Sequence, residues 1–207
     1  MKHLESKNLK KSFDFLNLAI EDLKKYEALL LKWQLKVNLI SSKTIEEIWD
    51  RHILDSAQLY FYLPKNAGSL IDLGSGAGFP GIVLALLNKK LKGPLKKIIL
   101  IESDLKKSIF LEEAARILDL NINVVNKRIE QVNNIKADVI TARALAPLEK
   151  LTAYAFPLLN KDGECLFLKG SQVDQEISEI KDDVEIQKYK SMLNAEGCIV
   201  KIKERKK

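Results

Sequence analysis

The sequence predicts an α/β protein in which a mostly parallel, doubly wound sheet is preceded by helices and ends in an antiparallel hairpin. From Ser69 onward, short apolar runs alternate with segments of helical periodicity, which is typical of parallel β-α units. The first apolar run leads directly into the glycine-rich turn Asp72-Leu-Gly-Ser-Gly-Ala-Gly-Phe-Pro-Gly81. A glycine-rich turn between the first strand and helix of such a sheet is typical of a ligand site.

The N-terminal part shows helical rather than alternating patterning. Apolar residues at helical spacing predict a helix from Leu9 to Val37 and a second from Thr44 to Tyr62. We expect Thr44 to cap the second helix and Pro64 to end it. The sequence therefore predicts a helical appendage over residues 1–64 on a Rossmann-like domain of residues 65–207, the two forming one compact unit.

The remaining elements follow the same alternation. We expect strands at 69–73, 98–102, 122–126, 137–141 and 163–168, and helices at 80–89, 104–119, 147–159 and 171–181. Two further β-like runs, 184–189 and 198–202, have no helix between them, which predicts a terminal antiparallel hairpin. A doubly wound sheet with this ending is the arrangement of class I methyltransferases.

Length and composition exclude several classes of protein. A chain of 207 residues fits one ordinary domain, and no apolar run approaches the ~18 residues that span a membrane. Cys165 and Cys198 lie far apart in apolar stretches, which predicts two buried, reduced thiols, and two histidines leave no Cys/His metal site. We expect a cytoplasmic monomer with no metal and no membrane partner.

The charge balance favours a polyanionic partner such as RNA. The net charge is +6, and the lysines occur in clusters. A solvated, lysine-rich surface explains the same composition, so both interpretations stay open.

The glycine turn raises the question of which cofactor it serves. Gly76-Ala-Gly78-Phe-Pro-Gly81 matches the dinucleotide pattern G-x-G-x-x-G, but Asp72 stands two residues before Gly74, where a carboxylate would repel a pyrophosphate. A carboxylate there suits S-adenosylmethionine, which is cationic and has no phosphate. Glu102 ends the second strand and can accept hydrogen bonds from ribose hydroxyls of either cofactor. A turn without a ligand and an NAD-dependent oxidoreductase are the alternatives.

Two basic residues follow later strands of the predicted sheet. Arg143 follows the strand at 137–141, and we expect it in the cleft, paired with Asp72 or Glu130 or contacting a phosphate or base edge. Lys169 follows the strand at 163–168 and can present a cation to RNA. A structural salt bridge for Arg143 and an exposed surface position for Lys169 are the alternatives. Both are candidates for positioning a substrate.

A further polar group lies in the N-terminal part. Arg51, His52 and Asp55 fall within one helical turn, so His52 can act as a general base or bind a phosphate. The alternative is a capping and ion-pair cluster that fastens the helices to the sheet.

Several motifs together resemble one family. These are Asn38-Leu, Arg51-His-Ile-Leu-Asp-Ser56, the glycine turn with its Phe79-Pro-Gly ending, Arg128-Ile-Glu130, Ala142-Arg-Ala and Leu168-Lys-Gly170. They are similar to the RsmG (GidB) family of bacterial 16S ribosomal RNA methyltransferases, over roughly residues 25 to 170.

The resemblance implies transfer of a methyl group from S-adenosylmethionine to N7 of a guanine in 16S ribosomal RNA, within the 30S subunit or an assembly intermediate. Guanine N7 has a free lone pair, so no general base is needed, and none is evident. The cofactor site that the class and the family together imply comprises Asp72, Gly74, Gly76, Gly78, Phe79, Glu102, Ile129, Glu130 and Arg143. The candidates for RNA contact are Asn38, Arg51, His52, Arg143 and Lys169. A class I methyltransferase acting on a small molecule and a non-catalytic RNA-binding module are the alternatives.

Overall fold

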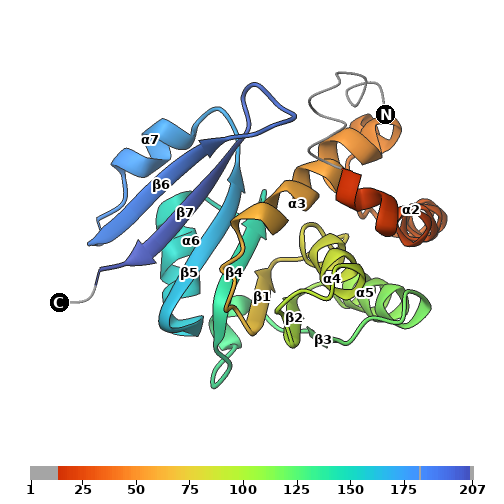
Figure 1. Ribbon diagram of the computed structural model, residues 1–207, viewed down its shortest axis with the longest axis horizontal. Coiled ribbons are helices and arrows are strands. Elements are labelled where there is room, and N and C mark those ends of the chain that lie inside the picture. Colours follow the sequence, from red (N-terminus) through yellow and green to blue (C-terminus); the bar gives the residue numbers. More distant parts are fainter. Residues whose placement is uncertain (1–13, 182, 206–207) are drawn as a thin grey trace.

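The protein is built on one seven-stranded sheet (Figure 1). The computed structural model describes residues 14–181 and 183–205. The strand order is β3-β2-β1-β4-β5-β7-β6, and β7 is antiparallel to both β5 and β6, whereas the other pairs are parallel. The strands are β1 (Ser69–Leu73), β2 (Lys97–Ile101), β3 (Ile122–Val125), β4 (Ala137–Arg143), β5 (Leu159–Lys169), β6 (Val184–Lys190) and β7 (Cys198–Glu204). The predicted parallel sheet and terminal hairpin are therefore confirmed.

Alternate residues of the strands form two cores, one on each face of the sheet. Leu70, Leu100 and Leu166 face the helices α2 (Ile20–Gln34), α4 (Gly81–Lys90) and α5 (Leu105–Ile117). Their sequence neighbours face α6 (Leu148–Ala155) and α7 (Val173–Ser178) on the other side. This alternation follows from the two-residue period of side chains along a strand. Cys165 and Cys198 are buried in the second core as free thiols.

The N-terminal helices differ from the two expected ones. Residues 9–13 lie outside the described part, and the rest of the first helix is divided into η2 (Asp14–Leu18) and α2, because Ala19 leaves the helical conformation at φ −110° and ψ −1°. The second expected helix is one continuous helical segment, in which the hydrogen bonding changes from 3₁₀ to π to α and back to 3₁₀. Its parts are η3 (Ser42–Glu47), η4 (Ile48–Leu54), α3 (Asp55–Ala57) and η5 (Gln58–Tyr62).

The predicted cap of this segment is wrong by three residues. Ser41 is the N-cap, and its hydroxyl accepts from the backbone N–H of Lys43. Thr44 instead donates its hydroxyl to the Ser41 carbonyl. The buried side chains of the segment join the core that contains α2, α4 and α5.

Two boundaries in the part of the chain from β4 to β5 also differ from expectation. The helix expected to reach residue 159 ends at Ala155, because Pro157 removes a backbone donor and the chain passes through a short 3₁₀ turn, η7 (Phe156–Leu158). Strand β5 therefore begins at Leu159 rather than 163. Strand β4 extends to Arg143, which is thus the last residue of a strand and not a residue of the following loop. No helix of the described residues is long and apolar enough to cross a membrane.

Candidate active site

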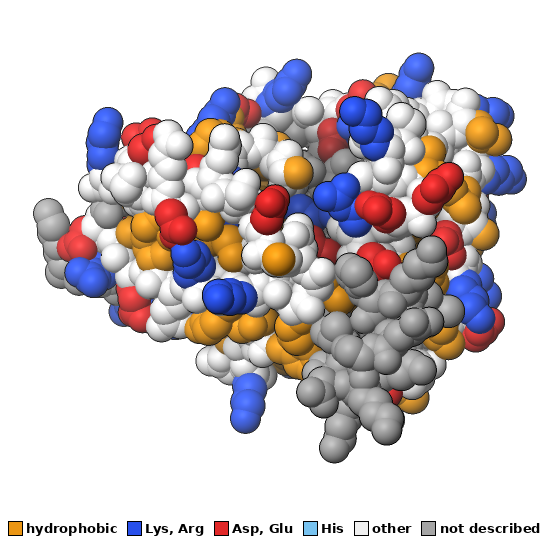
Figure 2. Space-filling view, turned by 90° about the horizontal axis from the view of Figure 1, so that it is seen from above, with side chains coloured by type: hydrophobic (Ala, Val, Ile, Leu, Met, Phe, Trp, Pro, Cys, Tyr) orange, Lys and Arg blue, Asp and Glu red, His pale blue; other side chains and the backbone are white. Residues whose placement is uncertain are grey.

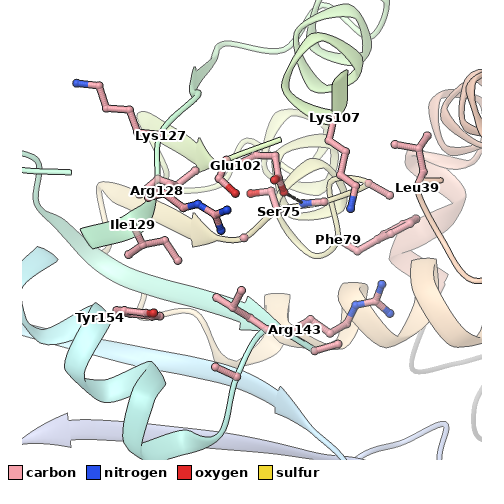
Figure 3. A pocket seen from close by; sticks show the side chains of 18 of the residues that line it. Leu39, Ser75, Phe79, Glu102, Lys107, Lys127, Arg128, Ile129, Arg143 and Tyr154 are labelled. Atoms are coloured by element: carbon pink, nitrogen blue, oxygen red, sulfur yellow. Dashed lines mark hydrogen bonds between the residues drawn. The ribbon is translucent and has the colours of Figure 1, made fainter. Parts of the chain in front are cut away.

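A cavity opens at the carboxyl ends of β1, β2 and β4 (Figure 3). It encloses about 500 Å³, which is within the ordinary range for small-molecule sites. Figure 3 shows Ile129 and Tyr154 at one end of it, Phe79 and Arg143 at the other, and Glu102 between them. We call it the first cavity. Other residues that line it are Leu39, Ile40, Gly74, Ser75, Gly76, Ala77, Lys107, Lys127, Arg128, Glu130, Ala144, Leu145 and Lys150.

The three glycines of the turn have different structural roles. Gly74 and Gly76 line the first cavity with φ of +60° and +55°, a conformation in which glycine alone is unstrained. Gly78 does not line it, so its predicted place in the site is wrong. A Cβ on Gly78 would lie 2.5 Å from Cγ1 of Ile82 and 2.9 Å from the hydroxyl oxygen of Tyr26. Gly78 therefore allows close packing behind the turn, where the Tyr26 hydroxyl donates to the carbonyl of Ala77.

Asp72 lies beneath the turn and not in the cavity. Its carboxylate is fully buried, accepts from the backbone N–H of Gly81 at 3.3 Å and from the hydroxyl of Thr141 at 2.8 Å, and contacts no open space. Burial raises its pKa to about 6, against the hydrogen bonds that lower it. The expectation of a direct contact between Asp72 and a cofactor is therefore wrong, and Asp72 instead ties β1, β4 and the start of α4 together.

Glu102 is the acidic group that does face the first cavity. One carboxylate oxygen accepts from Gly76 N–H and the other from Asp104 N–H, each at 2.8 Å. The side chain is thus fixed by backbone donors from both neighbouring turns. Each oxygen keeps a lone pair that can accept a hydroxyl proton.

The far end of the first cavity carries a polar group that the sequence did not reveal. Ile129 and Glu130 line it as predicted, and the Tyr154 hydroxyl donates to Glu130 at 2.6 Å and lowers its pKa. The Lys150 ammonium lies 5.4 Å from the centre of the Tyr154 ring. Tyr154 and Lys150 belong to α6, whose sequence reads as an ordinary amphipathic helix, so only the fold brings them to the site.

Arg143 stands where the first cavity meets a second one. Its guanidinium lies 5.1 Å from the centre of the Phe79 ring and donates to the carbonyl of Arg51 at 2.9 Å. Within the described residues it makes no ion pair with Asp72 or Glu130, so that predicted pairing is wrong. Arg143 joins the glycine turn to the N-terminal helices instead.

The second cavity encloses about 410 Å³ and shares Arg143 and Ala144 with the first. The N-terminal helices contribute Thr44, Arg51, His52 and Asp55. The carboxyl end of β5 and the segment that follows it through α7 contribute Lys169, Gly170, Gln172 and Glu176, and the loop between β6 and β7 contributes Asn194 and Gly197. Lys169 is held there by an ion pair with Glu176 at 2.6 Å and donates to the Ala146 carbonyl.

Arg51 and Asn38, two other candidates for RNA contact, occupy different surroundings. Arg51 is exposed at the rim of the second cavity and pairs with Glu47 at 3.4 Å. Asn38 is exposed and lines neither cavity. Its neighbours Leu39 and Ile40 do line the first cavity, and the Gln34 side chain holds their backbone with three hydrogen bonds.

His52 is placed in the second cavity but lacks the properties of a base or a cation. Its ring stacks on Phe79 with centroids 5.1 Å apart, and its Nε2 lies 2.9 Å from the Thr44 hydroxyl. Burial, together with Arg143 and Arg51, lowers its pKa to about 3. A pKa this low leaves the imidazole neutral at physiological pH and makes it a weak base, which argues against both predicted roles and favours the alternative, a group that fastens the helices to the turn.

The charged side chains around these cavities are mixed. Figure 2 shows the face toward which the parallel strands point, where Lys and Arg side chains are spread and interleaved with Asp and Glu. Among the described residues seen in this view, the basic side chains do not gather in one large patch.

The sequence matches the model of one protein family over residues 19–202, and that family is described as "GidB: rRNA small subunit methyltransferase G". The chain belongs to this family. Among its relatives, a ribosomal RNA small subunit methyltransferase G from Dinoroseobacter shibae is 47% identical, with 88% of this chain and 94% of the relative covered. Another from Paramagnetospirillum magneticum is 48% identical over 77% of this chain and 75% of the relative.

Solved structures show the same fold at low sequence identity. A ribosomal protein L11 methylase from Lactobacillus delbrueckii superimposes with a TM-score of 0.57 at 20% identity, covering 73% of this chain and 77% of that one. A 16S rRNA methylase, RmtB, has a TM-score of 0.57 at 15% identity, covering 89% and 75%. This GidB family member therefore has the class I, Rossmann-like methyltransferase fold that its sequence predicts.

Proposed function

We propose that this protein transfers a methyl group from S-adenosylmethionine to N7 of a guanine in 16S ribosomal RNA. The observation that carries the proposal is the junction of two cavities at Arg143. The first contains a glycine turn and a carboxylate, and the second opens toward segments outside the glycine-turn motif. Membership of a family described as rRNA small subunit methyltransferases supports RNA as the substrate.

The residues of the first cavity fit S-adenosylmethionine. A Cβ on Gly74 would lie 2.6 Å from Leu145, so the cavity wall requires bare backbone there. Glu102 would offer carboxylate oxygens to the ribose hydroxyls, Ile129 and Glu130 would lie beside the adenine, and Phe79 and Arg143 would lie beside the amino acid end. Asp72 and Gly78 support this site from behind the turn.

The chemistry needs alignment more than it needs acid or base. When bound, S-adenosylmethionine supplies an electrophilic methyl group, whose bonding electrons remain on sulfur as the N7 lone pair of guanine forms the new bond. No proton moves, and the positive charge passes to the purine. A neutral, stacked His52 is consistent with this reaction, because the residues have only to fix two groups in line.

The partner we propose is 16S ribosomal RNA within the 30S subunit or an assembly intermediate. The net charge of +6 supports a polyanionic partner. We further propose a cytoplasmic monomer in which residues 1–64 act as an appendage that supplies one wall of the second cavity.

The test uses purified protein and tritiated S-adenosylmethionine. We expect label in small-subunit ribosomal RNA from a deletion strain, none in RNA from the parent strain, and a single labelled guanine on mapping by primer extension. Cofactor binding without transfer to any RNA would favour a methyltransferase of small molecules. Failure to bind the cofactor at micromolar concentration would favour a non-catalytic RNA-binding module.

A further inference from the structure

The second cavity contains a carboxylate for which the reaction so far has no use. Asp55 is the first residue of α3 and lines this cavity together with Arg143 and Ala144, the residues that border the first cavity as well. It therefore lies in the second cavity beside the residues through which the two cavities meet.

Asp55 is held in place by neutral groups. The amide of Gln58 donates to one carboxylate oxygen at 2.7 Å, and Gln58 itself is fully buried. The same side-chain amide donates to the Ser191 hydroxyl, and the side-chain oxygen of Gln58 accepts from Met192 N–H. The carboxylate is thus fastened between the N-terminal helices and the loop that joins β6 to β7.

Three other charged groups of the second cavity have ion-pair partners, whereas the charge of Arg143 acts on Asp55 without an ion pair between the two in the described residues. Lys169 and Glu176 pair with each other, and Arg51 pairs with Glu47. Burial raises the pKa of Asp55 more than Arg143 and Arg51 lower it, as expected for a carboxylate whose charge is incompletely compensated. Hydrogen-bond donors on a ligand would stabilise a carboxylate of this kind.

Guanine brings those donors. Its Watson–Crick edge presents N1–H and the N2 amino group side by side, a pair that matches the two oxygens of a carboxylate. Adenine presents a lone pair at N1, which would face the carboxylate unfavourably. We propose that Asp55 is the specificity-determining residue that selects guanine, by accepting hydrogen bonds from N1–H and the N2 amino group. This inference rests on the proposed function.

The same contact also assists the reaction. Methylation at N7 leaves a positive charge on the purine and makes N1–H a stronger donor. A carboxylate that accepts from N1–H therefore binds the charged product-like state more strongly than the neutral guanine, which is the differential binding that accelerates a reaction.

The test compares guanosine with inosine, which lacks only the N2 amino group. After the methylated position has been mapped, two 16S RNAs are made by ligation, with guanosine or inosine at that position alone. Equilibrium binding at fixed salt and single-turnover methyl transfer are measured on both. For the wild type we expect a preference for guanosine of roughly 10-fold or more. For Asp55→Asn we expect transfer to the guanosine RNA to fall roughly 10- to 100-fold and the preference to approach one.

Two controls separate recognition from folding. Glu46→Gln removes an exposed carboxylate of the same helical segment outside both cavities, and we expect it to keep the wild-type preference. S-adenosylmethionine affinity by calorimetry should be unchanged in Asp55→Asn. If that variant does not fold, Asp55→Glu, which keeps a carboxylate at a shifted position, should retain a preference for guanosine that Asp55→Ser lacks.

The possible outcomes separate a failure of this inference from a failure of the proposed function. If the Asp55 variants that lack a carboxylate keep the wild-type preference for guanosine, Asp55 does not read the base and the inference fails. If the wild type methylates no guanine N7 in 16S RNA, so that no position can be mapped, the proposed function fails instead.

Discussion

The two cavities that meet at Arg143 are built in different ways. In the first, the backbone of the glycine turn forms one wall and holds Glu102 through Gly76 N–H, while residues 127–130 and α6 complete it. The second is formed by side chains from segments more than a hundred residues apart, tied by Lys169–Glu176 and by Gln58. The first has the character of a site for an invariant ligand, and the second of a site whose specificity depends on individual side chains.

The largest effect is expected at the turn. Gly74→Val places a branched side chain at φ +60°, with its Cβ 2.6 Å from Leu145, in the wall of the first cavity. We expect methyl transfer to fall by more than roughly 100-fold, because the cofactor is displaced, and calorimetry to detect no binding. Gly68→Ala is the control, since its Cβ would meet nothing closer than 3.6 Å. Wild-type affinity in Gly74→Val would place the cofactor elsewhere.

The difference between the cavities also explains what sequence alone predicts. The glycine turn, the place of Glu102 at the end of the second strand and the parallel sheet with its terminal hairpin depend on local spacing and alternation, and all are found in the structure as expected. The roles of Asp72 and Gly78 were wrong because spacing shows that a residue follows a strand, but not on which side of the turn its side chain lies. Tyr154 and the ion pair of Lys169 could not be predicted, because they depend on how α6 and α7 dock against the sheet.

Asp72→Asn tests whether the acid beneath the turn is a support and not a cofactor contact. The pKa of Asp72 is raised from 3.8 to about 6, so the folded state holds the proton more tightly than the unfolded chain. Its ionisation therefore lowers stability as pH rises from about 4 to about 6. We expect the free energy of unfolding of the variant, relative to the wild type, to increase by about 2 kcal/mol between pH 4 and pH 7. His52 titrates equally in both proteins, so the difference isolates Asp72. A difference that does not vary with pH, measured by urea unfolding, would contradict the assignment.

The ion pair of the second cavity should contribute measurably to stability. Lys169 and Glu176 are 2.6 Å apart with side chains only 10% and 16% exposed. A double-mutant cycle with Lys169→Met and Glu176→Gln should give a coupling energy of about 2 kcal/mol. The exposed pair Lys181–Glu149, in the same region at 3.7 Å, is the matched control and should couple by less than about 0.5 kcal/mol. Equal coupling in the two cycles would show that Lys169 is not a structural cation, and would return it to the candidates for RNA contact.

The smallest effect is expected at His52, whose titration should leave no trace in the pH dependence of activity. Its pKa of about 3 keeps the ring neutral from pH 5.5 to pH 8, so the wall between the two cavities carries the charge of Arg143 alone throughout this range. The ratio of kcat/KM between His52→Gln and the wild type should therefore change by less than about twofold from pH 5.5 to pH 8. The His52 imidazole resonances, identified by comparison with that variant, should not titrate in this range. An inflection near pH 6.5 that His52→Gln abolishes would instead give His52 an ordinary pKa and a proton to exchange, and would make the second cavity a site of acid–base chemistry as well as of recognition.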